Sequence, residues 1–107
     1  YKMSNSKVSI IITSYNYAGY IGSAIKSALN QTHPNIELIV IDDGSTDRTM
    51  DLLSKYKNDK RVKVISRENK GVVYTRNEGV NLSTGDFIVQ LDADDALEPT
   101  YVEECIK

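Results

Sequence analysis

Residues 36–47 read IELIVIDDGSTD. The first six are apolar with one exception, and such a nearly continuous run is typical of a strand inside a parallel sheet that helices cover on both faces. The six that follow are acidic, small or polar. Among them, Gly44, Ser45 and Thr46 form a predicted turn, in which the hydroxyl groups of Ser45 and Thr46 can cap the next helix. The stretch therefore predicts a buried strand at 36–41 that runs directly into two aspartates.

The alternation of strand and helix patterns continues outward from this stretch. Further short β-rich runs predict strands at residues 8–12, 62–66 and 86–91. Helices are predicted between them: from Ile21 to about Asn30, through Met50, Leu53 and Tyr56, from about Val72 to Leu82, and after Pro99. Strands separated by helices pair in parallel through right-handed crossovers. The expected fold is therefore α/β, an open and mainly parallel sheet with helices on both faces, preceded by a flexible segment at residues 1–7.

The composition is that of an ordinary globular domain. A length of 107 residues suits one domain, and 13 basic against 15 acidic residues leave a net charge of −2. This balance does not favour nucleic acid or an anionic membrane as a partner, and no stretch approaches the roughly 20 apolar residues of a membrane span. The single cysteine, Cys105, indicates a reducing compartment. Because Cys105 lies on the apolar face of the last predicted helix, we expect it to be buried.

Polar residues gather where ligands bind in open parallel sheets, beyond the carboxyl ends of the strands. The predicted strands are followed by TSYN from Thr13, DDGS from Asp42, RENK from Arg67 and DADD from Asp92. In the last of these, three carboxylates lie within four positions and repel one another unless a cation or a proton compensates them. Ligands that are all oxygen suit a hard cation, Mg²⁺ or Mn²⁺.

Four stretches carry a resemblance to a known family: VSIIITSYN, SALNQTHPNIELIVIDDGSTD, ENKGVVYTRNEG and TGDFIVQLDADD. Together they resemble the N-terminal, nucleotide-sugar-binding half of family 2 glycosyltransferases, inverting enzymes of the Rossmann-like GT-A fold. The similarity runs from about Val8 to Pro99 and keeps the order and spacing of the family's motifs. It implies an enzyme that transfers a sugar from a nucleotide-diphosphate sugar, expected to be UDP-linked, to an acceptor hydroxyl.

For the nucleoside, the resemblance implies three contacts. Thr13 and Tyr15 match the first loop of the family, with Tyr15 lying against the base, and Asp43 matches the aspartate that reads uracil. A carboxylate only accepts hydrogen bonds, and the N3–H of uracil is a donor. Thymine offers the same donor and guanine offers N1–H, so Asp43 alone does not select UDP among the nucleotides.

For the metal and the diphosphate, the resemblance points to the D-x-D motif. Asp92 is expected near the ribose and the metal, and Asp94 is expected to bind Mn²⁺ or Mg²⁺ directly. Lys70 and Arg76, in the stretch NKGVVYTRN, are expected to contact the base or the diphosphate.

The acceptor hydroxyl needs a general base, which in this family is a carboxylate of a later segment. We find no catalytic residue of this kind in the chain and expect the base downstream of Lys107. Residues 8–107 are thus expected to be the donor-binding part, with the acceptor-binding part missing. The resemblance also implies a role in cell-surface polysaccharide or glycan synthesis, and a place in the cytoplasm or at the inner face of the membrane.

Other interpretations remain open at this stage. The acids of the DADD loop can cap the last helix, and the DDG stretch can be a plain turn. As whole functions, the alternatives are a nucleotide-binding module without activity and a receiver-like signalling domain with an acidic pocket. The receiver alternative requires a lysine after a fifth strand, which we do not find.

Overall fold

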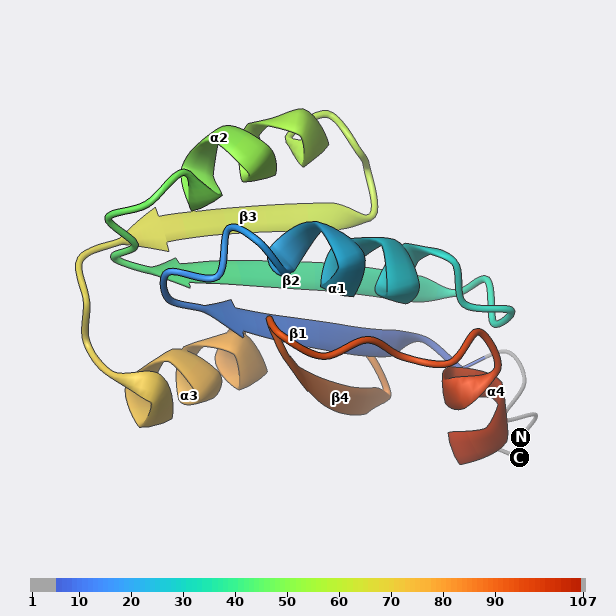
Figure 1. Ribbon diagram of the computed structural model, residues 1–107. Coiled ribbons are helices and arrows are strands. Elements are labelled where there is room, and N and C mark those ends of the chain that lie inside the picture. Colours follow the sequence, from blue (N-terminus) through green and yellow to red (C-terminus); the bar gives the residue numbers. More distant parts are fainter. Residues whose placement is uncertain (1–5, 107) are drawn as a thin grey trace.

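The fold is a parallel sheet of four strands in a computed structural model that describes residues 6–106. The strands are β1 (Val8–Ser14), β2 (Ile36–Asp43), β3 (Val62–Arg67) and β4 (Phe87–Asp92). Their order is β3-β2-β1-β4, and every neighbouring pair is parallel. The chain first builds outward from β1 to β3 and then returns to place β4 on the other side of β1 (Figure 1).

Helices occupy both faces of this sheet. They are α1 (Ile21–Leu29), α2 (Thr49–Leu53) with the 3-10 turn η2 (Ser54–Tyr56), α3 (Val72–Leu82) and α4 (Tyr101–Cys105). In Figure 1, α3 lies on the opposite side of the sheet from α1. This placement follows from the strand order, because right-handed crossovers that run in opposite directions along a sheet place their helices on opposite faces. The α/β fold expected from the sequence is confirmed.

Alternation along β1 decides what each face buries. Ile10 and Ile12 belong to the large core cluster that includes Ile25 of α1, whereas Ile11 belongs to a smaller cluster on the other face. Against Ile11 lies Gly79 of α3, where an added Cβ would stand 2.4 Å from the Ile11 Cγ2 atom. Glycine is therefore required at 79 so that α3 can approach the sheet closely.

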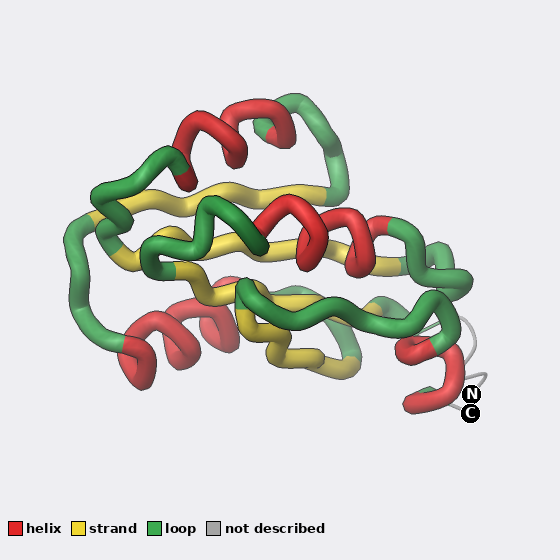
Figure 2. The backbone as a smooth tube through the Cα atoms, in the orientation of Figure 1, coloured by secondary structure: helices red, strands yellow, loops and turns green. Residues whose placement is uncertain are grey.

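Parallel pairing extends further along the chain than the apolar run suggested. β1 reaches Ser14 and β2 reaches Asp43, because Ser14 pairs with Asp42 and Asp43 pairs with Arg67. Asp42 and Asp43 thus belong to a strand, not to a turn. As a result, the carboxyl ends of β1, β2 and β3 lie level, and the loops that follow them gather at one end of the sheet (Figure 2).

The predicted cap of the second helix was wrong. Neither Ser45 nor Thr46 caps α2; the carboxylate of Asp47 accepts bonds from the Thr49 backbone N–H at 3.0 Å and from the Thr49 hydroxyl. Ser45 instead donates to the carboxylate of Asp42. The two hydroxyl residues belong to the loop because α2 begins only at Thr49.

Two predictions for the ends of the chain were a flexible segment at residues 1–7 and a buried Cys105. The flexible segment predicted for residues 1–7 falls mainly on residues 1–5, outside the described ones, while Ser6 is buried and the Lys7 backbone N–H donates to Asp86. The burial predicted for Cys105 was wrong: Cys105 is exposed, since α4 buries Val102 and Ile106, spaced by one turn, instead. Within residues 6–106, no helix has the length and apolar character needed to cross a bilayer.

Candidate nucleotide-sugar site

A cavity of about 360 Å³ opens at the carboxyl end of the sheet. It is lined by Thr13, Ser14, Tyr15, Tyr17, Asp43, Val72, Thr75, Arg76, Asp92 and Asp94. Its position matches the reversal in strand order between β1 and β4, where the loops after the two strands diverge and leave a crevice. Six of the seven predicted site residues line this one cavity, and the exception is Lys70.

Strand register brings these residues together from distant parts of the sequence. Thr13 pairs with Asp92 across β1 and β4, and Asp43 pairs with Arg67 across β2 and β3. The start of α3 contributes Thr75 and Arg76 from the other side. The strand ends and the start of α3 thus bring these side chains to one cavity.

Asp43 is buried and forms hydrogen bonds with both of its oxygens. Oδ1 accepts from Arg67 Nη1 at 2.5 Å and from the Lys70 backbone N–H at 2.8 Å, and Oδ2 accepts from the Gly71 backbone N–H at 3.1 Å. Burial acts to raise the pKa of Asp43, but the hydrogen bonds from Lys70 and Arg67 outweigh it and hold that pKa below its ordinary value. The cavity therefore presents an ionised carboxylate of fixed orientation.

Arg67 was not assigned a role from the sequence, although it opens the polar RENK stretch. Its guanidinium also donates to Glu78 Oε1 through Nε at 2.8 Å, to Thr75 Oγ1 through Nη2 at 2.8 Å and to the Glu68 carbonyl through Nη1 at 2.9 Å. A signal in the sequence existed: an arginine at the last position of a strand that pairs with the strand of an aspartate. Reading it required the register of the sheet.

Tyr15 stands on a loop that Asn16 helps to anchor. The Asn16 carboxamide oxygen accepts from the Thr46 backbone N–H at 2.8 Å, and the Asn16 backbone N–H donates to Ser45 Oγ at 2.8 Å. Asn16 adopts φ of 58°, a left-handed conformation that asparagine tolerates. Tyr15 lines the cavity and remains 46% exposed there.

Lys70 lies apart from the other predicted residues. Only its backbone N–H reaches Asp43, while its ammonium group stands 4.9 Å from the centre of the Tyr74 ring. Arg67 lies 5.1 Å from the same ring. The Lys70 side chain thus contacts an aromatic face and does not line the cavity.

Sequence reasoning left other lining residues unassigned. Tyr17 is 37% exposed at the cavity mouth, and Thr75 is fully buried beside Asp43. Ser14 is buried, and within residues 6–106 its hydroxyl is the sole buried side-chain polar group without a hydrogen-bond partner. Its neighbours Thr13 and Tyr15 were assigned a role from the resemblance. No pattern in the sequence indicates that Ser14 lines the cavity as well.

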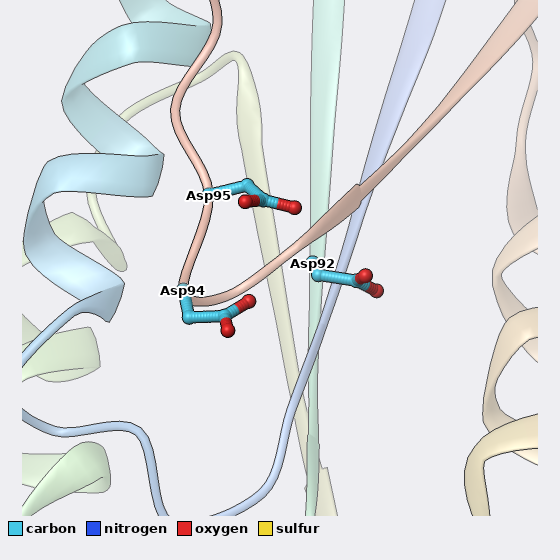
Figure 3. A group of neighbouring side chains, drawn as sticks. All are labelled: Asp92, Asp94 and Asp95. Atoms are coloured by element: carbon cyan, nitrogen blue, oxygen red, sulfur yellow. The ribbon is translucent and has the colours of Figure 1, made fainter.

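Three carboxylates form the acidic side of the site. Asp92 ends β4, and Asp94 and Asp95 follow in a turn closed by the Asp95 backbone N–H, which donates to the Asp92 carbonyl at 3.0 Å. One oxygen of each side chain lies within 4.8 Å of the others, and Figure 3 shows the three projecting from the strand end and the loop. The three are exposed, so water can complete a coordination shell. Such a hard oxygen set fits Mg²⁺ or Mn²⁺.

Comparison with known proteins decides the family. The model of the family described as "Glycosyl transferase family 2" matches residues 9–107. The chain belongs to glycosyl transferase family 2. The assignment excludes the receiver-like alternative, and it accounts for four separate motifs that meet at one cavity.

Several members and structures of the glycosyltransferase class are similar to this chain. A chondroitin synthase of Pasteurella multocida is 46% identical over 101 residues, which are 94% of this chain and 10% of the synthase. The crystal structure of S. aureus TarS 1-349 in complex with UDP-GlcNAc has a TM-score of 0.84 and 31% identity, and the match covers 92% of this chain and 30% of the TarS 1-349 chain. This family 2 chain therefore spans between a tenth and a third of the length of these proteins.

A third similar structure is the mannosyltransferase PcManGT of Pyrobaculum calidifontis, in complex with GDP-Man and Mn²⁺. It has a TM-score of 0.76 and 25% identity, and the match covers 90% of this chain and 29% of PcManGT. Together with TarS, it supports the GT-A fold for this family 2 chain.

Proposed function

We propose that this chain is the donor-binding part of a metal-dependent glycosyltransferase, which transfers a sugar from a UDP-sugar to an acceptor hydroxyl with inversion. One observation carries the proposal: the carboxylate of Asp43, the exposed ring of Tyr15 and the D-x-D carboxylates line the same 360 Å³ cavity. The volume falls within the usual range for small-molecule sites. The bound UDP-GlcNAc in TarS supports a UDP-sugar as the donor.

The nucleoside would lie along the wall formed by β1 and β2. Tyr15 offers a ring for stacking, an interaction that contributes about 1–3 kcal/mol per base, and Asp43 accepts the N3–H of uracil. Thr13, at the end of β1 and in register with Asp92, offers a hydroxyl to the nucleoside. We assign Lys70 a supporting role in this wall, because its backbone N–H holds Asp43.

The diphosphate would lie between α3 and the end of β4. Arg76 supplies a cation at this position, and its guanidinium Nη2 stands 3.0 Å from Asp92 Oδ1. Asp94 and Asp92 would hold the divalent ion. A bound Mn²⁺ or Mg²⁺ would neutralise the charge that grows on the leaving diphosphate oxygen as the bond to the sugar breaks.

The acceptor hydroxyl then attacks the sugar carbon from the face opposite the diphosphate, which inverts the anomeric centre. This attack requires a base to take the hydroxyl proton. The carboxylates of the cavity already have other proposed roles. Asp43 binds its protein donors and the nucleotide base, and Asp92 and Asp94 bind the metal. We therefore propose that the general base comes from outside residues 6–106.

The relatives and Cys105 support a proposal for the product and the place of the reaction. The similarity to a chondroitin synthase supports a role in cell-surface polysaccharide synthesis. The exposed thiol of Cys105 suits a reducing compartment, so we propose that the enzyme works on the cytoplasmic side of the cell.

Calorimetry on the full-length protein tests the proposal. We expect UDP to bind only with Mn²⁺ or Mg²⁺ present, and Asp94→Ala to weaken that binding about tenfold or more, since it removes a metal ligand. The matched control is Asp51→Ala, which removes an exposed carboxylate of α2 that pairs with Arg48. UDP affinity that is equal with and without divalent ions, or equal in Asp94→Ala and wild type, would contradict the proposal.

A further inference from the structure

The carboxylate of Asp43 has few acceptor positions left for a ligand. An ionised carboxylate offers about four. Arg67 Nη1 and the Lys70 N–H use both positions of Oδ1, and the Gly71 N–H uses one of Oδ2. Thr75 also approaches the carboxylate, but its hydroxyl has one proton and donates it to the Gly71 carbonyl at 2.7 Å. One acceptor position therefore remains, on Oδ2.

Arg67 cannot easily leave Oδ1. Its side chain is 14% exposed, and all three of its nitrogens donate to protein acceptors, including Glu78 and Thr75 at 2.8 Å each. The planar guanidinium is thus held in one orientation by acceptors on α3 and at the end of β2. A fixed fork of this kind gives the bond to Asp43 a defined direction.

We infer that Arg67 is a positioning residue that determines base specificity: by occupying Oδ1 of Asp43, it leaves the carboxylate able to accept a single N–H from the nucleotide base. The inference rests on the proposed function, in which this cavity binds the nucleotide. Arg67 does not line the cavity, so it acts through Asp43 and not by touching the ligand.

The single free acceptor position on Asp43 would favour binding of uracil over guanine. Uracil presents one N–H, at N3, between two carbonyl groups, and one acceptor position satisfies it. Guanine presents two donors side by side, N1–H and the 2-amino group, which match the two oxygens of a free carboxylate. With Oδ1 occupied, guanine would bury a donor without a partner, which weakens its binding. The site is therefore built for a uracil-type base.

The test compares UDP and GDP affinities in the full-length protein with Mn²⁺ present, by calorimetry. We expect wild type to bind UDP about tenfold more tightly than GDP. In Arg67→Met, Oδ1 regains a free position and Asp43 loses its fixed direction, so UDP affinity should fall and the UDP-to-GDP ratio should approach one. Arg61→Met is the matched control, because Arg61 precedes β3 at the end away from the cavity and bonds the Leu29 carbonyl.

A second variant, Arg67→Lys, provides the test if Arg67→Met does not fold. Lysine keeps the charge but cannot bond Asp43, Glu78 and Thr75 from one guanidinium plane, so Arg67→Lys should also narrow the ratio, to a smaller extent. Wild type that binds GDP as tightly as UDP, or Arg67 variants that keep the wild-type ratio, would overturn the inference. Wild type that binds neither nucleotide would overturn the proposed function as well, which distinguishes the two failures.

Discussion

Arg76 reaches from α3 across the cavity to Asp92 at the end of β4, with its Nη2 3.0 Å from Asp92 Oδ1. Both side chains are about half exposed, at 46% and 53%. The guanidinium thus compensates one carboxylate of the acidic cluster, and in the proposed function it also supplies a cation for the diphosphate. Arg76 can pair with Asp92 or with the diphosphate of the proposed ligand, because an exposed ion pair of this kind is weak and exchanges readily.

Replacing Arg76 should separate metal binding from nucleotide binding. In Arg76→Gln we expect Mn²⁺ alone to bind up to about fivefold more tightly, since an exposed pair contributes about 0.2–1 kcal/mol and no longer competes for Asp92. UDP binding at saturating Mn²⁺ should weaken. Electron paramagnetic resonance of free Mn²⁺ and calorimetry of UDP measure the two effects. Arg48→Gln, which breaks the exposed pair with Asp51, should change neither; equal Mn²⁺ affinity with unchanged UDP affinity in Arg76→Gln would contradict the assignment.

Tyr15 should contribute through its ring and not through its hydroxyl. We expect Tyr15→Ala to weaken UDP binding by about tenfold or more, in line with the 1–3 kcal/mol of base stacking, and Tyr15→Phe to stay close to wild type. Tyr20→Ala serves as the control, because Tyr20 is exposed but does not line the cavity. If Tyr15→Phe bound UDP as weakly as Tyr15→Ala, the hydroxyl and not stacking would make the contact with UDP.

Glu37 should make folding stability sensitive to acid. Burial acts to raise its pKa, but hydrogen bonds from Ser9 and Thr84 and the charge of Lys7 lower it from 4.5 to about 2. A pKa that is lower in the folded state stabilises the fold above the unfolded value, by about 3 kcal/mol here, and this contribution is lost as the pH falls from about 4.5 to about 2.

The pH dependence can be measured by urea unfolding of wild type and Glu37→Gln. At neutral pH the variant should be less stable, and the difference should shrink steadily between pH 4.5 and pH 2. Glu68→Gln, at an exposed glutamate, should show no such difference. A gap between wild type and Glu37→Gln that stays constant across this range would exclude the role of the Glu37 charge.

Two helical glycines should respond to alanine in opposite directions. At Gly79 the new Cβ would lie 2.4 Å from Ile11 Cγ2, so α3 must shift and we expect a loss of about 1–3 kcal/mol in the free energy of unfolding. At Gly22 of α1 nothing lies within 4 Å, so alanine should stabilise the fold by up to about 1 kcal/mol through helix propensity. Chemical unfolding checks both; equal effects would mean that α3 is not in close contact with β1.

Local patterns were sufficient for the order of the elements. Strand and helix periodicity is a property of neighbouring residues, so α3 begins and ends at Val72 and Leu82 as predicted, and the other elements agree within a few residues. The gathering of the polar clusters at one edge of the sheet could also be predicted, because parallel strands end at the same edge. The start of α2 at Thr49 and the exposure of Cys105 could not be predicted, because each depends on where a helix begins or which side of it packs.

The sequence by itself determined a parallel α/β sheet with polar residues at its carboxyl edge, since hydrophobic period and strand polarity follow from the order of residues alone. Only the tertiary structure decided which polar groups face one another. Asp43 and Arg67 are 24 positions apart and meet because β2 and β3 pair in register, and Lys70 turns away to Tyr74 although it lies beside the site in sequence. Hydrogen bonds depend on distance and direction in space, which a linear spacing does not contain.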